Sequence, residues 1–122
     1  MHAYAQVFLG FMFRHGEGVA QDYAEAVRLY SLAAAQGHAG AQINLGVMFS
    51  KGQGVAQDYA EAVRLYRLSA AQGYALGQNN LGRMFETGRG VAQDRAEAIR
   101  LYRLAAAQGN AYAKSNLKRL GA

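Results

Sequence analysis

Residues 16–37 read GEGVAQDYAEAVRLYSLAAAQG, and closely similar stretches return at residues 52–73 and 88–109. The offset is 36 residues both times. Self-similarity at a fixed period of this length is the sequence signature of a repeat protein. Each copy contains the same glycines, the same aspartate and the same Leu-Tyr pair, so each copy is expected to fold in the same way.

The repeat extends over the whole chain of 122 residues. Residues 1–36 match residues 37–72 at 26 of 36 positions, and residues 37–72 match residues 73–108 at 25 of 36. Residues 109–122 begin a fourth copy and stop halfway. We therefore predict one domain over residues 1–122, built from three repeats and a C-terminal capping half-repeat.

Each repeat predicts a pair of helices, and the first helix carries its apolar residues on one face. Leu9, Met12 and Phe13 show the spacings of three and four that produce such a face. Gly16 and Gly18 follow, and because glycine adopts positive φ, they predict a tight turn. The first helices are expected at residues 3–14, 39–50, 75–86 and 111–120.

The second helix is marked at both ends. Asp22 suits the N-cap, and Glu25 three residues later completes an aspartate variant of the capping box. Gly37 follows the last turn, where a left-handed residue ends a helix. With the copies in later repeats, the second helices are expected at residues 22–36, 58–72 and 94–108.

The second helix is apolar on most sides, so it requires cover from its own first helix and from the next repeat. Small residues such as Gly10 and Ala26 allow the helix axes to approach to about 8 Å. Stacked pairs of this kind bury what a single pair cannot. The fold class that we predict is an all-α solenoid of three 36-residue helix pairs with a capping half-pair.

The repeat unit resembles the Sel-like repeat (SLR) family, which is related to the tetratricopeptide repeat. The resemblance is carried by the pattern Ala-x-x-Asn-Leu-Gly-x-Met-Phe-x-x-Gly-x-Gly-Val-x-Gln-Asp-Tyr and the Leu-Tyr and Gln-Gly pairs after it. Ala20 stands where the family often has proline, Leu29 where it often has tryptophan, and Phe8 where it has asparagine. The resemblance implies a right-handed α/α superhelix and an adaptor whose concave face binds partner proteins or peptides. Cysteine-rich relatives are linked to β-lactam binding, and the absence of cysteine here argues against that branch.

Positions that differ between copies fall on one face of the first helices, because they too are spaced by three and four. We predict that this face forms a concave groove and the protein-binding site. The groove changes from apolar and aromatic to polar and basic along the chain. The site residues are Tyr4, Phe8, Phe11, Ile43, Asn44, Val47, Leu76, Asn79, Asn80, Arg83, Tyr112 and Asn116.

Three of these residues, Asn44, Asn80 and Asn116, recur one repeat apart. An amide donates and accepts at once, which suits the backbone of an extended peptide ligand. The alternative is that these amides bond to neighbouring helices, since most side-chain hydrogen bonds go to backbone or water. The sequence leaves both interpretations open.

Phe8 and Phe11 conflict with the rule that a terminal repeat presents a polar cap. Lys114, Lys118 and Arg119 supply such a cap at the other end. Burying two phenylalanines contributes on the order of 3–6 kcal/mol, which argues against leaving both in water. We expect this end to dock onto a second copy as a homodimer, onto a partner, or onto preceding repeats. The alternative is local cover by Tyr4 and its neighbours.

Composition and charge narrow the function classes. The chain is 52% apolar and 17% charged, which argues against disorder, and it has no cysteine for a disulfide, thiolate metal site or nucleophile. The net charge of +5 divides into −1 over residues 1–50 and +6 over residues 51–122. A basic half favours acidic partners or solubility. Arg28 and its copies pair with glutamates three residues earlier, which argues against nucleic acid as the ligand.

Motifs for catalysis are weak. Ser115-x-x-Lys118 matches a short signature of serine acyl enzymes, but the companion Ser-Asp-Asn and Lys-Thr-Gly segments are missing. The histidines have no carboxylate at ligand spacing. We therefore predict a non-enzymatic scaffold with no cofactor and no metal. The apolar stretch at residues 7–13 lacks the basic start and cleavage site of a signal peptide, and no run approaches the roughly 20 residues of a membrane span. The chain is expected to be soluble, in the cytoplasm or the periplasm.

Overall fold

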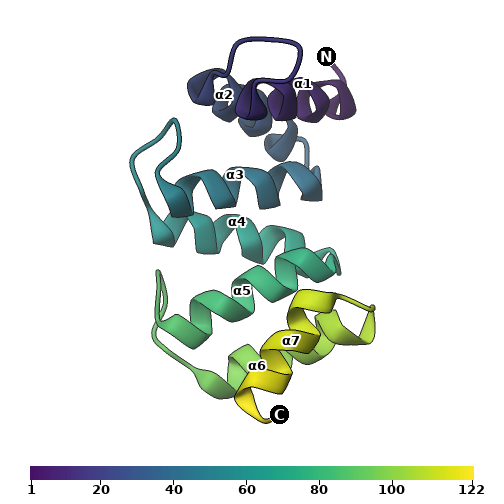
Figure 1. Cartoon of the computed structure of the whole chain (residues 1–122), viewed down its shortest axis with the longest axis vertical. Coiled ribbons are helices and arrows are strands. Elements are labelled where there is room, and N and C mark those ends of the chain that lie inside the picture. The colour runs from purple at the N-terminus through teal and green to yellow at the C-terminus, as the bar shows by residue number, and fades with distance from the viewer.

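A computed structural model describes all 122 residues and contains seven α-helices and no strand (Figure 1). The all-α prediction is confirmed, and every predicted helix end lies within one residue of the observed end. The helices are α1 (Ala3–His15), α2 (Tyr23–Ala35), α3 (Ala39–Lys51), α4 (Tyr59–Ala71), α5 (Ala75–Thr87), α6 (Arg95–Ala107) and α7 (Ala111–Leu120).

The helices pair as α1 with α2, α3 with α4, and α5 with α6, and the pairs stack so that the two termini lie at opposite ends (Figure 1). The second helix of each pair also packs on the first helix of the next, and α3 contacts α5 directly. This nearest-neighbour packing is that of a solenoid. We call the side formed by α1, α3, α5 and α7 the inner face.

The second helices begin at the predicted aspartates, but only half of the capping box forms. The Asp22 carboxylate accepts from the Glu25 backbone N–H at 3.1 Å, and Asp58 and Asp94 do the same for Glu61 and Glu97 at 3.0 Å. The reciprocal half of the prediction is wrong. The Asp22 N–H already donates to the Phe13 carbonyl at 2.8 Å, and the Glu25 carboxylate pairs with Arg28.

Glycine is required in the turns for two reasons, a positive φ angle and a close contact with the preceding repeat. Gly52 and Gly54, in the turn between α3 and α4, have φ of 69° and 73°. A Cβ on Gly54 would also lie 2.7 Å from the Tyr23 carbonyl oxygen. The turn of one repeat therefore rests directly on the start of α2 in the preceding repeat, which fixes how the repeats stack.

Each helix pair is held at short distance by a tyrosine ring that lies against a glycine. A Cβ on Gly46 would lie 2.6 Å from Cε1 of Tyr66, which is closer than real Cβ atoms approach. The same contact joins Gly10 to Tyr30 and Gly82 to Tyr102, at 2.8 Å in both cases. The three tyrosines are buried. Glycine at this position is thus a packing requirement of every repeat.

A pair of glutamines closes the other end of each repeat. Gln72 Nε2 donates to Oε1 of the buried Gln42 at 2.9 Å and to the Gly37 carbonyl at 3.1 Å. Gln36 and Gln108 donate in the same way to buried glutamines in their own repeats, at 2.7 and 2.9 Å. These bonds satisfy amides that would otherwise be costly to bury.

We predict opposite effects for two Gly→Ala substitutions in α3. Gly46→Ala should lower the free energy of unfolding by about 1–3 kcal/mol, because the new methyl group overpacks against the Tyr66 ring. Gly40→Ala should be neutral or stabilising by up to about 1 kcal/mol, because its methyl group meets only the His38 side chain and alanine favours helix. Urea unfolding followed by circular dichroism measures both. Equal stability of the two variants would contradict the packing requirement.

Candidate protein-binding face

The structure leaves most of the predicted site residues accessible on the inner face. Tyr4, Phe8 and Tyr112 are 82%, 66% and 68% exposed, and Phe11, Leu76 and Arg83 are also exposed. Asn44, Val47, Asn80 and Asn116 are half-buried. These residues come from all four first helices, so the inner face is one continuous surface along the stack.

Two predicted residues, Ile43 and Asn79, do not belong to this surface, because both are buried. Helical periodicity placed them on the variable face, but the Asn79 side chain is directed toward the first helix of the following unit. The Asn79 side chain accepts a hydrogen bond from Asn116 of α7 at 2.9 Å. Ser115, at the same position in α7 with no following repeat over it, is exposed. Variation at this position therefore reflects repeat stacking.

The three recurring asparagines divide between the two interpretations that the sequence left open. Asn116 bonds to the neighbouring helix through Asn79 and also accepts from Arg119 at 3.1 Å. Asn44 makes no hydrogen bond to the chain, and Asn80 accepts only a long 3.5 Å contact from Asn79. The amides of Asn44 and Asn80 are therefore available to a ligand, whereas that of Asn116 is engaged.

An ion pair that the sequence analysis missed crosses between α5 and α7. Glu86 accepts from both terminal nitrogens of Arg119, at 2.8 and 2.7 Å, and from the Tyr102 hydroxyl at 2.7 Å. These hydrogen bonds, those of Arg119 foremost, hold the pKa of Glu86 below its usual range. Arg119 was expected to solvate the C-terminal cap. The signal was its place 33 residues beyond Glu86, three residues short of one repeat.

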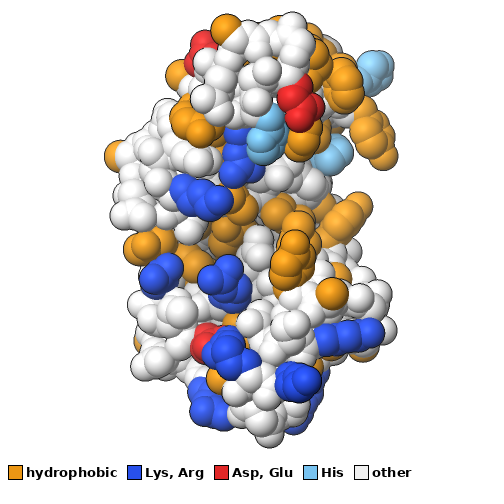
Figure 2. Space-filling view, in the orientation of Figure 1, with side chains coloured by type: hydrophobic (Ala, Val, Ile, Leu, Met, Phe, Trp, Pro, Cys, Tyr) orange, Lys and Arg blue, Asp and Glu red, His pale blue; other side chains and the backbone are white.

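Two hollows bring predicted residues together on the inner face. The middle pocket, between α3 and α5, has a volume of about 250 Å³ and is lined by Val47, Asn80 and Arg83 among others. The C-terminal pocket, between α5 and α7, has about 370 Å³ and is lined by Tyr112 and Asn116. Figure 2 shows basic side chains spread from the middle of the stack to its C-terminal end, with one acidic side chain beside them in the lower half.

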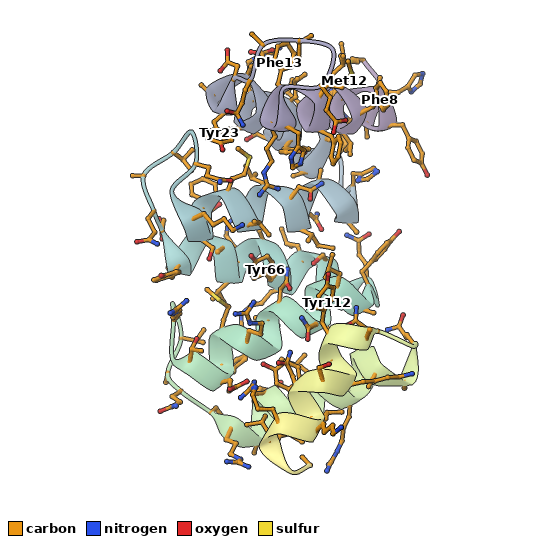
Figure 3. The ribbon with its side chains drawn as sticks, viewed as in Figure 1. Phe8, Met12, Phe13, Tyr23, Tyr66 and Tyr112 are labelled. Atoms are coloured by element: carbon orange, nitrogen blue, oxygen red, sulfur yellow. The ribbon has the colours of Figure 1, made fainter.

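The middle pocket also contains residues that the sequence analysis did not assign to the site. Tyr66 was expected to serve the core alone, yet its edge reaches the pocket, and it lies in the middle of the stack in Figure 3. Lys51 and Arg89 supply further positive charge. Burial raises the pKa of Tyr66 to about 12, so its hydroxyl remains a hydrogen-bond donor at neutral pH.

At the N-terminal end, Phe8 and Phe11 are not covered locally, so that alternative is wrong. The Tyr4 ring meets the edge of His38, with ring centroids 5.4 Å apart, and does not cover Phe8. Phe11 lies beside the exposed His15 ring, at 4.3 Å between centroids, and is itself exposed. Figure 3 shows Phe8 on α1, at the end of the stack. The patch of Tyr4, Phe8 and Phe11 is an exposed apolar surface.

Two features of other classes of site are absent from the structure. Nowhere do three His, Cys, Asp or Glu side chains come together in a way that could hold a metal ion. None of the seven helices is long and apolar enough to cross a membrane.

Stacked helix pairs with a variable inner face define an α-solenoid of the repeat-scaffold class. The Sel1 repeat pattern matches residues 3–38, 39–74 and 75–110, and the chain therefore belongs to the Sel1 repeat family. Proteins of this family are generally non-catalytic protein-interaction scaffolds. The matched repeats begin two residues later than the predicted ones, at the starts of the first helices.

Solved structures of bacterial proteins give the same fold. One is c5321, a protective antigen present in uropathogenic Escherichia coli strains that displays an SLR fold, with a TM-score of 0.92 and 44% identity over 94% of this chain and 25% of that one. A Sel1 repeat protein from Oxalobacter formigenes gives a TM-score of 0.88 and 35% identity over 94% of this chain and 47% of that one. The chain thus spans a quarter to a half of these relatives.

A third structure, the Helicobacter pylori cysteine rich protein B, is 20% identical with a TM-score of 0.78, over 94% of this chain and 89% of that one. At this identity the likeness concerns the fold alone. No curated protein sequence matches the chain significantly.

The Glu86–Arg119 pair predicts a pH-dependent contribution to stability. Because the pKa of Glu86 is lowered on folding, the contribution is complete above the unfolded carboxyl pKa of about 4.3 and disappears as the pH falls through the lower folded value. Glu86→Gln should therefore destabilise the chain at neutral pH by up to about 1 kcal/mol, because Arg119 is half-exposed and screened by solvent.

Urea unfolding across a pH series measures this effect. The difference from wild type should shrink below about pH 4. Glu17→Gln is the matched control, since Glu17 is exposed and its side chain makes no hydrogen bond. A Glu86→Gln curve that runs parallel to wild type at all pH values would contradict the role of the pair.

Proposed function

We propose that the chain is a non-catalytic scaffold that binds an extended segment or a helix of a partner protein along its inner face. One observation carries the proposal. The first-helix residues identical in every repeat, such as Gly46 and Met48, are buried in the stack, whereas most first-helix residues that differ between repeats are accessible on the inner face. Variation that packing does not require is typical of a surface adapted to a particular ligand.

Particular contacts support this division. The invariant Gly46, Tyr66 and Gln72 are all engaged within or between repeats. The variable Asn80 and Arg83 leave polar groups free at the middle pocket. The apolar Val47 lies beside them, so the pocket offers both an apolar wall and hydrogen-bonding groups. A partner segment would place an apolar side chain toward Val47 and polar groups toward Asn80 and Arg83.

The test uses a displayed library of short random peptides selected on the wild-type chain. Asn80→Ala and Arg83→Ala should each weaken the selected peptides about tenfold, or roughly 1.4 kcal/mol, because both remove direct contacts. Arg103→Ala is the matched control, since Arg103 is exposed on α6, away from the inner face. Unchanged affinity in both inner-face variants, measured by fluorescence anisotropy, would contradict the proposed groove.

A second candidate function is self-assembly through the N-terminal patch of Tyr4, Phe8 and Phe11. The observation that favours it is the 66% exposure of Phe8, at a position where the other copies have asparagine. Large exposed apolar side chains that lie together mark interaction sites. A second copy of the chain, packed patch to patch, would remove both phenylalanines from water.

Molar mass by light scattering over a dilution series tests the self-assembly candidate. Wild type should be dimeric at the higher concentrations, and Phe8→Asn should be monomeric throughout, because it restores the polar residue of the other repeats. Phe13→Leu, on a half-buried residue that packs in the core, serves as the control and should remain dimeric. A wild type that stays monomeric at every concentration would exclude self-assembly.

A further inference from the structure

Because the repeats are equivalent, the middle pocket can be compared residue by residue with the C-terminal pocket. At the C-terminal end, one carboxylate, that of Glu86, is held by the Arg119 guanidinium and the Tyr102 hydroxyl. Asn116 completes the group by accepting from Arg119. These side chains form a receptor for a carboxylate, and the carboxylate comes from the chain itself.

One repeat earlier, the same receptor is present without its carboxylate. The equivalents of Arg119, Tyr102 and Asn116 in the preceding repeat, 36 residues earlier, are Arg83, Tyr66 and Asn80. The position of Glu86 is occupied by Ser50. All four of these residues line the middle pocket. The donors are therefore retained, while the acceptor is replaced by a side chain that is too short and too weak to stand in for it.

The donors of the middle pocket have no other partner in the chain. Arg83 donates no hydrogen bond and joins no ion pair. The Tyr66 hydroxyl makes no hydrogen bond to the chain, and Tyr66 lines the open pocket. Glu86 lies nearby on the same helix, and Arg83 helps to lower its pKa from a distance. The oxygens of Glu86 are nevertheless already taken by Arg119 and Tyr102.

The lining of the middle pocket is positively charged, which also favours an anionic ligand. Lys51 and Arg89 lie beside Arg83 in its lining, and no acidic residue lines it. Arg89 rests over the Tyr59 ring at 5.4 Å, which holds the guanidinium without neutralising it. The first repeat offers no equivalent, because Arg14 occupies the place of Glu86 and Val47 that of Arg119. The vacant receptor is thus confined to the middle of the inner face.

We propose that the middle pocket receives the carboxylate of an aspartate or glutamate from a partner protein, held by Arg83, Tyr66 and Asn80. This inference rests on the proposed scaffold function and specifies the chemistry of its ligand. A carboxylate satisfies a guanidinium and a hydroxyl together, as Glu86 demonstrates in the next repeat. The apolar Val47 at the edge of the same pocket favours a peptide over a polyphosphate backbone.

The first experiment asks whether the receptor exists, and it needs no partner. Ser50→Glu should rebuild the internal arrangement and raise the urea midpoint at about pH 7 relative to Ser50→Gln, which is similar in size but uncharged. The difference should disappear below about pH 4, where the new carboxylate is protonated. If Ser50→Glu is no more stable than Ser50→Gln at neutral pH, the receptor is not formed and the proposal is overturned.

The second experiment asks what fills the receptor. A displayed library of random peptides is selected in parallel on wild type and on Ser50→Glu, whose pocket carries its own carboxylate. Wild type should enrich peptides with an aspartate or glutamate at a fixed position, and Ser50→Glu should not. Replacing that residue by its amide should weaken binding to wild type about tenfold but leave binding to Arg83→Ala nearly unchanged. Arg83→Ala is expected to fold, because Arg83 makes no hydrogen bond to the chain.

The outcomes separate this inference from the proposed function. Peptides without an acidic preference, bound equally by wild type and Ser50→Glu, would overturn the carboxylate site and leave the scaffold function standing. A library that yields no peptide on either protein would overturn both. A single-stranded DNA oligonucleotide that binds wild type with steep salt dependence, and that the acidic peptides fail to displace, would assign the pocket to phosphate and overturn the proposal.

Discussion

The contact between a tyrosine ring and a glycine within each helix pair governs the rest of the structure. It sets the distance between the two helices, since any Cβ at Gly46 would enter the Tyr66 ring. The ring then lies across α3, and its edge reaches the inner face at the middle pocket. One packing contact thus fixes the helix pair and also delivers a hydroxyl to the binding face. The invariant turn glycines allow each turn to pack against the second helix of the preceding repeat, and so fix how one pair stacks on the next.

Because packing is secured by invariant residues, the inner face is free to vary. Tyr30, Tyr66 and Tyr102 occupy the same position in each repeat, but the surroundings of their hydroxyls differ. Tyr102 donates to Glu86, Tyr66 lines the middle pocket together with Ser50, and the Tyr30 hydroxyl is buried without a partner. The scaffold therefore repeats its architecture while changing its chemistry, which gives one end an apolar character and the middle a positive charge.

The fold could be predicted from the sequence because its determinants are local and occur three times. Asp22 favours the start of the second helix and Gly37 favours its end. The same residues recur in the other two repeats, so the three copies support one another. The site was harder to predict, because it depends on contacts between repeats. Periodicity placed Ile43 and Asn79 on the variable face, but both are buried in the stack. The Glu86–Arg119 pair spans 33 residues, and only stacking brings its members together.

If variation between repeats marks the binding face, a ligand should perturb the first helices of neighbouring repeats. An NMR titration of the isotope-labelled chain, of 13.1 kDa, with an acidic peptide selected on the wild type tests it most directly. Amide shift changes should be concentrated at residues 44–51 of α3 and 80–89 around the end of α5, with α2 and α6 little affected. Changes concentrated on the second helices, with α3 and α5 unperturbed, would contradict it.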